Sequence, residues 1–260
     1  MINEISEKIV RSREYKRGAY PRGCEYCVKG EKVTFYMTFK CDYKCFYCSV
    51  PSELRNTEKM MVGNIPVEDI DDAFKHIKQY KCVAISGGEP LTDIGRVLDI
   101  IKRAKKDNIY TYLFTDGSGR GRLTPSLLNK LADAGLDEIK MSAKLKDEKT
   151  LLFDPYEIVK NSPVPIHAEF PMLPDFVNEV YDFALKLNNI GASYLLLDQA
   201  EFTTGNASEM LKRGFKQKDG IILGSKEAAF EIIKRVQNNN LNIKVLYCGA
   251  SNPKHQYKRT

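Results

Sequence analysis

Short runs rich in β-branched and aromatic residues alternate with helical periodicity along most of this 260-residue chain. The runs predict seven strands, at Val33–Phe39, Cys82–Ser86, Tyr110–Thr115, Glu138–Ser142, Val164–Phe170, Tyr194–Asp198 and Ile243–Cys248. Between them, apolar residues recur at three- and four-residue steps, which is typical of helices with one buried face. Ser225 is expected to be the N-cap of the last helix. This alternation predicts an α/β fold with a parallel sheet, and six or seven units suit a partial barrel better than a closed eight-stranded one. In such folds the chemistry is expected at the carboxyl ends of the strands.

The composition is that of an ordinary globular protein, with 43% hydrophobic and 28% charged residues, which excludes disorder and fibrous repeats as the main description. No segment approaches the roughly 18 consecutive apolar residues of a membrane span, and the amino terminus lacks an apolar signal core. We therefore expect a cytoplasmic protein without a membrane partner. Because the cytosol keeps thiols reduced, the seven cysteines are hard to interpret as a disulfide framework.

Three cysteines lie on one short loop directly after the first predicted strand. Cys41, Cys45 and Cys48 follow one another at spacings of four and three residues. Cysteine thiolates are the standard ligands of iron–sulfur clusters, and a 4Fe–4S cubane held by three thiolates leaves one iron open to a reactant. A zinc loop is the alternative, but a closed structural zinc site needs a fourth Cys or His, which would have to come from a distant part of the chain.

The run Cys41-x-x-x-Cys45-x-Tyr47-Cys48 resembles the signature of radical S-adenosylmethionine (SAM) enzymes, including the aromatic residue before the last cysteine. The next predicted strand, Cys82–Ser86, is followed by Gly87 and Gly88. Because glycine has no side chain, the backbone there can lie close to a ligand. That segment resembles the one that holds the methionine amino group of SAM in this family. Thr115-Asp116-Gly117 is similar to the family's Thr-Asn-Gly, with Asp in place of Asn. A hydroxyl and a cation after the fourth strand suit the SAM carboxylate or ribose. The cofactor-binding residues that the resemblance and these patterns predict are Tyr47, Gly87, Gly88, Glu89, Pro90, Thr115, Asp116, Ser142 and Lys144.

The resemblance implies a partial (β/α)6 barrel over residues 33–250, preceded by a basic, cysteine-bearing extension at residues 1–32 and followed by a basic tail at residues 251–260. It also implies a 4Fe–4S cluster, SAM bound at the open iron, and an electron donor such as ferredoxin or flavodoxin. One electron would then cleave SAM to methionine and a 5′-deoxyadenosyl radical, which takes a hydrogen atom from a substrate.

Four cysteines lie outside the predicted cluster loop. Cys24 and Cys27 form a Cys-x-x-Cys pair in the extension, and Cys248 ends the last predicted strand. If the extension lies across the barrel mouth, these three thiols would converge on a second metal site, with His255 as a fourth ligand. The site would hold an iron–sulfur cluster or zinc. A functional thiol pair is the alternative. Cys82 lies inside an apolar strand and is expected to pack as a small hydrophobic residue.

The wider pattern of the chain resembles an archaeal-type group related to pyruvate formate-lyase activating enzymes, although Asp198-Gln199-Ala200-Glu201 differs from that group's Asn-Glu-Leu-Glu. A protein substrate, as in glycyl-radical activation, is one prediction. RNA or a nucleotide is another, because tyrosines lie among the cations of both basic ends. Glu169, Asp198 and Glu201 fall near strand ends, where they would bind polar groups of a substrate or shift protons; solvated or structural carboxylates are the alternative. A metal-binding electron carrier or structural protein is the alternative from another class.

Overall fold

The computed structural model describes residues 20–119, 122–147 and 149–249. His255, the tail at residues 251–260 and most of the amino-terminal extension lie outside these ranges. Seven strands form the parallel part of one sheet: β1 (Lys32–Thr38), β4 (Cys82–Gly87), β5 (Tyr110–Thr115), β6 (Glu138–Ser142), β7 (Ile166–Met172), β8 (Tyr194–Gln199) and β11 (Lys244–Cys248). Each lies within two residues of its predicted bounds, so the predicted α/β fold is confirmed.

The sheet has the strand order β11-β8-β7-β6-β5-β4-β1-β2-β3, and its edges do not meet, which leaves the barrel open. The edge strands β2 (Met60–Val62) and β3 (Ile65–Val67) form an antiparallel hairpin that the sequence did not predict. A second small hairpin pairs β9 (Gln217–Lys218) with β10 (Ile221–Ile222).

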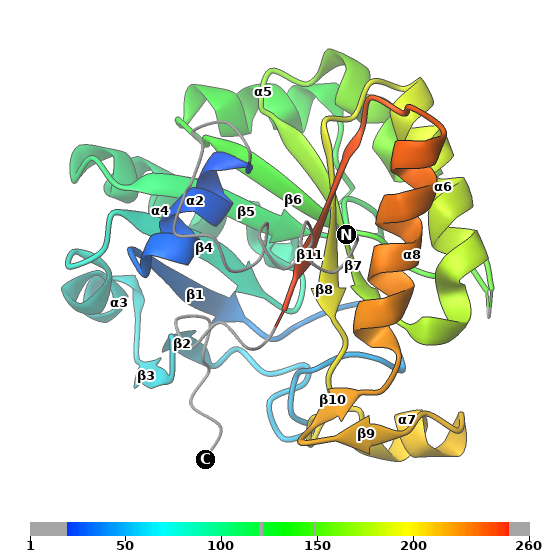
Figure 1. Cartoon of the computed structure of the whole chain (residues 1–260). Coiled ribbons are helices and arrows are strands. Elements are labelled where there is room, and N and C mark those ends of the chain that lie inside the picture. Colours follow the sequence, from blue (N-terminus) through cyan, green and yellow to red (C-terminus); the bar gives the residue numbers. More distant parts are fainter. Residues whose placement is uncertain (1–19, 120–121, 148, 250–260) are drawn as a thin grey trace.

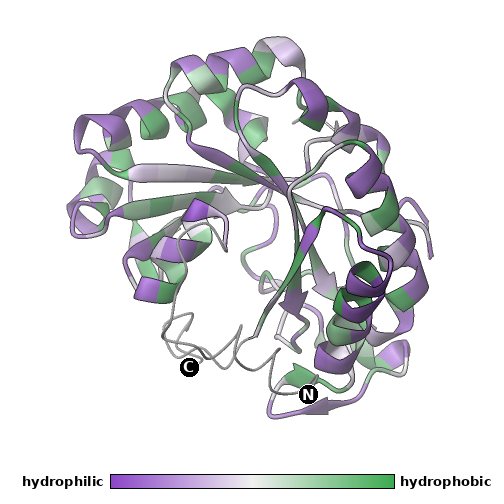
Figure 2. Ribbon diagram, turned by 45° about the horizontal axis from the view of Figure 1, so that its top comes forward, coloured by the Kyte–Doolittle hydropathy of each residue, from purple (hydrophilic) through white to green (hydrophobic). Residues whose placement is uncertain are grey.

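Helices cover the outside of the curved sheet (Figure 1). They are α3 (Ile70–Ile77), α4 (Ile94–Lys106), α5 (Pro125–Asp133), α6 (Val177–Asn189) and α8 (Ser225–Asn238), with the short α7 (Ala207–Lys212) next to the second hairpin. The 3-10 turns η1 (Pro90–Asp93), η3 (Asp154–Asn161) and η4 (Pro174–Phe176) complete the connections. Each outer helix carries both hydrophobic and hydrophilic residues, as an amphipathic helix on a sheet should (Figure 2). No described helix has both the length and the apolar character that crossing a bilayer requires.

The two faces of the sheet differ in chemistry because side chains alternate along each strand. In β6, Ile139 and Met141 are fully buried in the large hydrophobic core beneath the outer helices. Glu138, Lys140 and Ser142 alternate with them and so belong to the opposite, inner face of the sheet. The interior of the partial barrel is therefore lined by polar residues on this strand.

Helix α2 (Arg22–Lys29) packs on this inner face (Figure 1). The Gly23 N–H donates to Glu138 Oε2 at 2.9 Å, and Lys140 Nζ donates to Cys24 Sγ at 3.2 Å. A Cβ atom at Gly23 would lie 2.7 Å from the Tyr112 ring, so glycine is what allows the helix to come this close. As a result, α2 covers the inner face over β1, β4 and β5 and reaches β6 through Glu138 and Lys140.

Candidate functional site

The cysteine loop that follows β1 is held by its own hydrogen bonds. Cys41 N–H donates to Asn56 Oδ1 at 3.4 Å, and Cys48 N–H donates to the Cys45 carbonyl at 3.1 Å. The Arg55 guanidinium donates to the Cys48 carbonyl at 3.0 Å. Cys41, Cys45 and Cys48 are free thiols and half-buried, so they are shielded by the fold and remain reachable by a cofactor.

The three thiols of the loop are the type of ligand that iron–sulfur clusters take. Within residues 20–119, 122–147 and 149–249, no three His, Cys, Asp or Glu side chains are grouped closely enough to hold one metal ion. A cubane is wider than one ion, so its thiolate ligands stand further apart than the ligands of a zinc site, which lie about 2.0–2.3 Å from the metal.

The end of β4 packs directly against the backbone that precedes Cys41. Gly88 N–H donates to the Thr38 carbonyl at 2.8 Å, and Glu89 N–H donates to the Lys40 carbonyl at 2.7 Å. A Cβ at Gly87, where φ is +141°, would lie 1.8 Å from Thr38 O, and one at Gly88 would lie 2.2 Å from Lys40 O. Both glycines were predicted to bring the backbone close to a ligand. In the structure they bring it close to the start of the cysteine loop, which they thereby position.

The Glu89 carboxylate joins the ends of β4 and β5. It accepts hydrogen bonds from Leu91 N–H at 2.9 Å, from the Thr115 hydroxyl at 2.8 Å and from Asp116 N–H at 2.7 Å. Burial and the neighbouring Asp116 raise the pKa of Glu89 to about 8, although the backbone donors favour the carboxylate. A carboxylate has about four acceptor positions, so most of this one is used inside the protein. Pro90, also buried, begins the turn η1.

Asp116 and the cysteine loop are linked through Ser118. Asp116 Oδ1 accepts from the Ser118 N–H at 2.7 Å and from its hydroxyl at 2.8 Å, while Ser118 Oγ lies 2.7 Å from the Tyr43 hydroxyl. Thr115 and Asp116 therefore both contact Glu89. Asp116 is also linked to the cysteine loop through Ser118 and Tyr43.

Lys144 faces the thiols and the carboxylates together. Burial acts to lower the pKa of Lys144, but the charges of Cys45, Asp116, Glu89 and Cys41 outweigh burial and raise it. One cation thus lies within electrostatic range of both predicted halves of the site, the cysteine loop and the strand ends that were expected to hold SAM.

Tyr47 and Ser142 complete the predicted set. The buried Tyr47 ring packs edge-on against Phe170, with centroids 5.7 Å apart, and its hydroxyl donates to the Ala143 carbonyl at 3.4 Å. Burial raises the pKa of Tyr47 far above its ordinary value. Ser142 ends β6 and lies beside Glu169 in the register with β7. All nine predicted cofactor-binding residues therefore lie at or just after the carboxyl ends of β1, β4, β5 and β6.

A hollow of about 310 Å³ opens beside the cysteine loop. Its lining residues are Tyr43, Lys44, Cys45, Phe46, Tyr47, Leu145, Asp147 and Arg213. The Arg213 guanidinium lies 4.1 Å from the centre of the Phe46 ring, so a residue after α7 covers the loop through a cation–π contact. Phe46, Asp147 and Arg55 were not singled out from the sequence, and no local pattern marks them.

Of the cysteines predicted to hold a second metal, Cys24 and Cys27 lie on α2 and Cys248 ends β11. Burial raises the pKa of Cys24 to about 11, against the opposing charge of Lys140. Cys27 is buried in α2. Burial, and then the charges of Asp198, Cys24 and Cys27, raise the pKa of Cys248 well above its ordinary value. The second metal remains a prediction. Cys82 is fully buried and packs with Ala84 and Tyr112, which confirms its role in the core.

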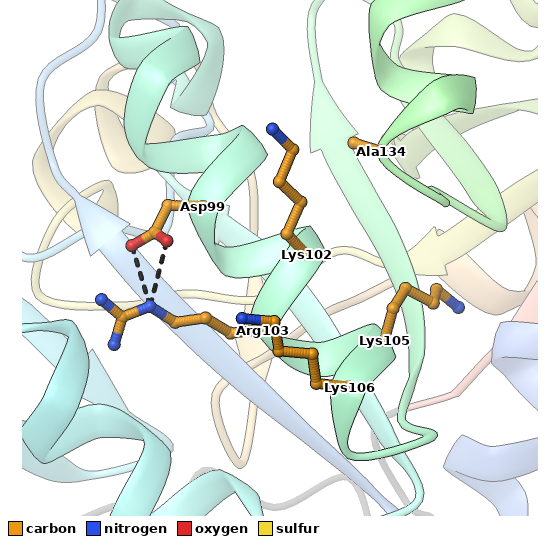
Figure 3. A pocket seen from close by; sticks show the side chains of 6 residues that line it. All are labelled: Asp99, Lys102, Arg103, Lys105, Lys106 and Ala134. Carbon is orange, nitrogen blue, oxygen red and sulfur yellow. Dashed lines mark hydrogen bonds and ion pairs between the residues drawn. The ribbon is translucent and has the colours of Figure 1, made fainter.

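A larger hollow, of about 770 Å³, lies on the outside of the fold between α4 and α5 (Figure 3). Its lining residues are Asp99, Lys102, Arg103, Lys105, Lys106 and Ala134. The ends of α4 and α5 lead into the amino ends of β5 and β6, so this hollow is at the opposite edge of the sheet from the cysteine loop. It carries no thiol, and its Arg103 is already paired with Asp99 (Figure 3).

Comparison with known proteins finds a family match for part of the chain. Residues 35–153, which run from β1 through the cysteine loop and beyond β6, match the family model of the Radical SAM superfamily. A Methanocaldococcus jannaschii protein named as a candidate glycyl-radical enzyme activating enzyme is 29% identical in an alignment that covers 90% of this chain and 65% of that protein. The 7-carboxy-7-deazaguanine synthase of Bacillus cereus is 27% identical in an alignment that covers 70% of this chain and 82% of that enzyme.

Among solved structures, Streptococcus suis SuiB bound to SAM superposes with a TM-score of 0.62 at 14% identity, over 87% of this chain and 53% of SuiB. At 14% identity, the similarity to SuiB shows a shared fold and nothing about activity. The chain spans about two thirds of the length of the M. jannaschii relative and about half that of SuiB.

Proposed function

We propose that this chain, which carries a radical SAM domain, cleaves SAM reductively and uses the radical so formed to take a hydrogen atom from a substrate. In this proposal Cys41, Cys45 and Cys48 hold a 4Fe–4S cluster. When bound, the reduced cluster and SAM supply methionine and a 5′-deoxyadenosyl radical, chemistry that protein side chains do not supply by themselves.

The observation that carries the proposal is the position of Lys144. The charges of Cys41, Cys45, Glu89 and Asp116 all act on its ammonium group and raise its pKa. A site that only carried electrons would need neither a cation nor a buried carboxylate, such as that of Glu89, next to the thiols. Such groups suit the amino and carboxylate ends of a bound amino acid, which is what SAM presents.

Each residue then has a role in binding or in positioning. The two glycines set the cysteine loop against β4, and Glu89 sets β4 against β5. Ser142 and Lys144 offer a hydroxyl and a cation to the SAM carboxylate or ribose. The buried Tyr47 and its aromatic neighbour Phe46 exclude water beneath the loop.

The electron donor in this proposal is a small carrier such as ferredoxin or flavodoxin, in the cytoplasm, where thiols stay reduced. The names of the two sequence relatives imply different substrates, a glycyl-radical enzyme for one and a deazaguanine for the other. A protein substrate is supported by the first of them. RNA was predicted from the basic ends, most of which lie outside the described residues.

Anaerobic reconstitution tests the proposal. Reconstituted protein should contain about four irons with matching sulfide if it holds one cubane, or about eight if the inner cysteines hold a second. After reduction with dithionite and addition of SAM, we expect 5′-deoxyadenosine. A preparation with a full cluster that neither binds SAM nor yields this product would contradict the proposal and favour the electron-carrier alternative.

A further inference from the structure

The segment between β8 and α8, residues 201–224, is attached to the cysteine loop, and we refer to it as the insertion. It contains α7 and the hairpin of β9 and β10, and it lies beside the chain that follows β1 (Figure 1). The Arg55 guanidinium donates to the Gly205 carbonyl of the insertion as well as to the Cys48 carbonyl. Asn206 Nδ2 donates to the Tyr47 carbonyl at 3.2 Å. These hydrogen bonds fix the insertion to the end of the cysteine loop.

An aromatic contact joins the insertion to the middle of the loop. The Arg213 guanidinium lies 4.1 Å from the centre of the Phe46 ring, and the buried Phe215 ring is stacked on Phe46 with centroids 6.4 Å apart. Arg213 also lines the hollow of about 310 Å³ beside the loop, together with Lys44 and Cys45. The insertion therefore borders an opening whose wall includes one of the three predicted cluster ligands.

The exposed side of the insertion is basic. Residues 207–219 hold the four cations Lys212, Arg213, Lys216 and Lys218 and the two acids Glu209 and Asp219. Lys212 is paired with Glu209 at 2.7 Å. Lys216 and Lys218 are exposed, and neither forms an ion pair with an acid in the described part of the chain. Lys44 of the cysteine loop is exposed too. A partner that docks here meets a positive surface next to the thiols.

Exposed apolar side chains accompany these cations. The exposed large hydrophobic residues of the described chain are Val28, Ile65, Leu211 and Leu223, and the last two belong to the insertion. Helix α7 buries Met210 and leaves Leu211 63% exposed. Leu223 is 50% exposed, and its N–H donates to the Lys216 carbonyl at 2.9 Å. Exposed apolar groups among polar residues are typical of surfaces that bind another protein.

The chemistry of this surface favours an acidic protein over a nucleic acid. Single-stranded nucleic acids bind basic surfaces with their bases stacked on aromatic rings. None of the four exposed large hydrophobic residues named above is aromatic, and Phe215 of the insertion is buried. An acidic protein would match the cations and cover the leucines. Interfaces of electron carriers are small, below about 1,200 Å² in total, so a small surface with complementary charge is sufficient.

The position of the insertion indicates what this partner does. The proposed reaction needs one electron from outside the protein, delivered to the cluster of the cysteine loop. A carrier docked on the insertion would lie next to that loop. The other basic surface, the hollow lined by Lys102 and Lys106, is at the opposite edge of the sheet (Figure 3). A carrier bound there would be separated from the cluster by the barrel.

We propose that the exposed side of the insertion, together with Lys44, is the docking surface for an acidic carrier protein that reduces the cluster. The carrier loses one electron, and the cluster gains it. Carboxylates of the carrier pair with Lys44, Lys216 and Lys218, and its apolar side chains cover Leu211 and Leu223. This inference rests on the proposed function, because it states where the electron of that reaction enters.

Reduced flavodoxin, an acidic flavin protein, is the probe for this surface. Formation of 5′-deoxyadenosine by the reconstituted protein with SAM is measured with subsaturating flavodoxin at about 0.1 M salt, and separately with dithionite. Lys216→Glu combined with Lys218→Glu should lower the flavodoxin-driven rate roughly tenfold or more, because complementary charge speeds association. Leu211→Ser should lower it severalfold. Dithionite is a small molecule that needs no docking surface, so with it these variants should equal the wild type.

Lys102→Glu combined with Lys106→Glu is the matched control. It changes the net charge by the same amount at the opposite edge of the sheet (Figure 3). Exposed charges further apart than about 10 Å are largely screened at 0.1 M salt, so this variant should keep the flavodoxin-driven rate. Equal losses in the two double variants would assign the effect to net charge and overturn the inference. A normal flavodoxin-driven rate in the insertion variant, or loss of its dithionite-driven product, would also overturn it.

Binding measurements identify the class of partner. By fluorescence anisotropy, the wild type should bind labelled flavodoxin, and Lys216→Glu combined with Lys218→Glu should bind it more weakly. A single-stranded RNA oligonucleotide should not bind to the insertion. RNA binding that this variant abolishes, with an unchanged flavodoxin-driven rate, would assign the surface to a nucleic acid and overturn the inference.

The two proposals fail separately. Wild-type protein that forms no 5′-deoxyadenosine with dithionite contradicts the proposed function, while flavodoxin binding through Lys216 and Lys218 would still stand. Product with dithionite, but neither product with flavodoxin nor binding of it, overturns the docking surface and leaves the proposed function intact.

Discussion

The Glu89 carboxylate accepts the backbone N–H of Asp116 at 2.7 Å, which ties the end of β4 to the end of β5 beneath the candidate SAM site. Glu89→Gln should therefore cost stability, because an amide nitrogen would face one of the two N–H donors that now meet an oxygen. We expect the free energy of unfolding to fall by about 1–3 kcal/mol, measured by urea denaturation. The exposed Glu157→Gln serves as control, and equal values for the two variants would contradict this role of Glu89.

The cysteines should separate into two classes. Cys45→Ala should abolish both the iron–sulfur content and 5′-deoxyadenosine formation, because the loop then offers only two thiolates. Cys82→Ala removes a fully buried thiol and should leave iron, sulfide and product nearly unchanged. Iron and sulfide analysis with product quantification by chromatography checks both variants. Equal losses would mean that the cysteines were assigned wrongly.

Gly88 should not tolerate a side chain. In Gly88→Ala the new Cβ would lie 2.2 Å from the Lys40 carbonyl oxygen, so β4 or the cysteine loop must shift. We expect cluster content to fall several-fold. Gly95→Ala is the matched control, since the nearest atom to its Cβ would be 3.7 Å away and alanine favours the helix by about 1 kcal/mol. Normal iron content in Gly88→Ala would show that this contact is dispensable.

Lys144→Gln should weaken SAM binding without removing the cluster. Loss of one charged donor to a carboxylate is expected to lower affinity by roughly tenfold or more, measured by equilibrium dialysis of SAM. Lys146→Gln, two residues further along and exposed, is the control. If iron content falls together with SAM affinity, Lys144 supports the loop and has no direct role in binding SAM.

His167 should give the fold a pH dependence. Burial lowers the pKa of His167 below its ordinary 6.5, so the folded state binds fewer protons than the unfolded state in that range. The contribution of His167 to the free energy of unfolding should be full above about pH 6.5 and be lost as the pH drops below it. Because the raised pKa of Glu89 acts in the opposite sense over the same range, this contribution is measured as a difference. Urea denaturation between about pH 5 and 7.5 should show it in the wild type and in His76→Gln, which keeps His167, relative to His167→Gln. His167→Gln should lack it, and a wild-type slope in that variant would exclude His167 as the source.

The parallel strands and the cysteine loop could be predicted from the sequence, because both are encoded by local patterns. Apolar runs of five to seven residues identify buried strands, and the three cysteines lie within eight residues of one another. Helix α2 was missed because its stability depends on distant contacts, such as that between Gly23 and Glu138, 115 residues apart.

Two local interpretations were changed by long-range packing. Ser225 was predicted as an N-cap, but Gly224 occupies that position with φ at +86°, and the Ser225 hydroxyl instead accepts the N–H of Ala200 at 2.9 Å. Gly87 and Gly88 were identified from their motif, while their contact with Thr38 and Lys40 became visible only in the folded chain. A motif therefore predicts which residues matter more readily than it predicts what they touch.

Helix α2, lying over the inner face, has a kinetic consequence. The contact that joins it to β6, between Gly23 and Glu138, spans 115 residues of the chain, so the helix can dock only after β6 has formed. Because contacts of such long range form slowly, docking of α2 is expected to be a late step of folding.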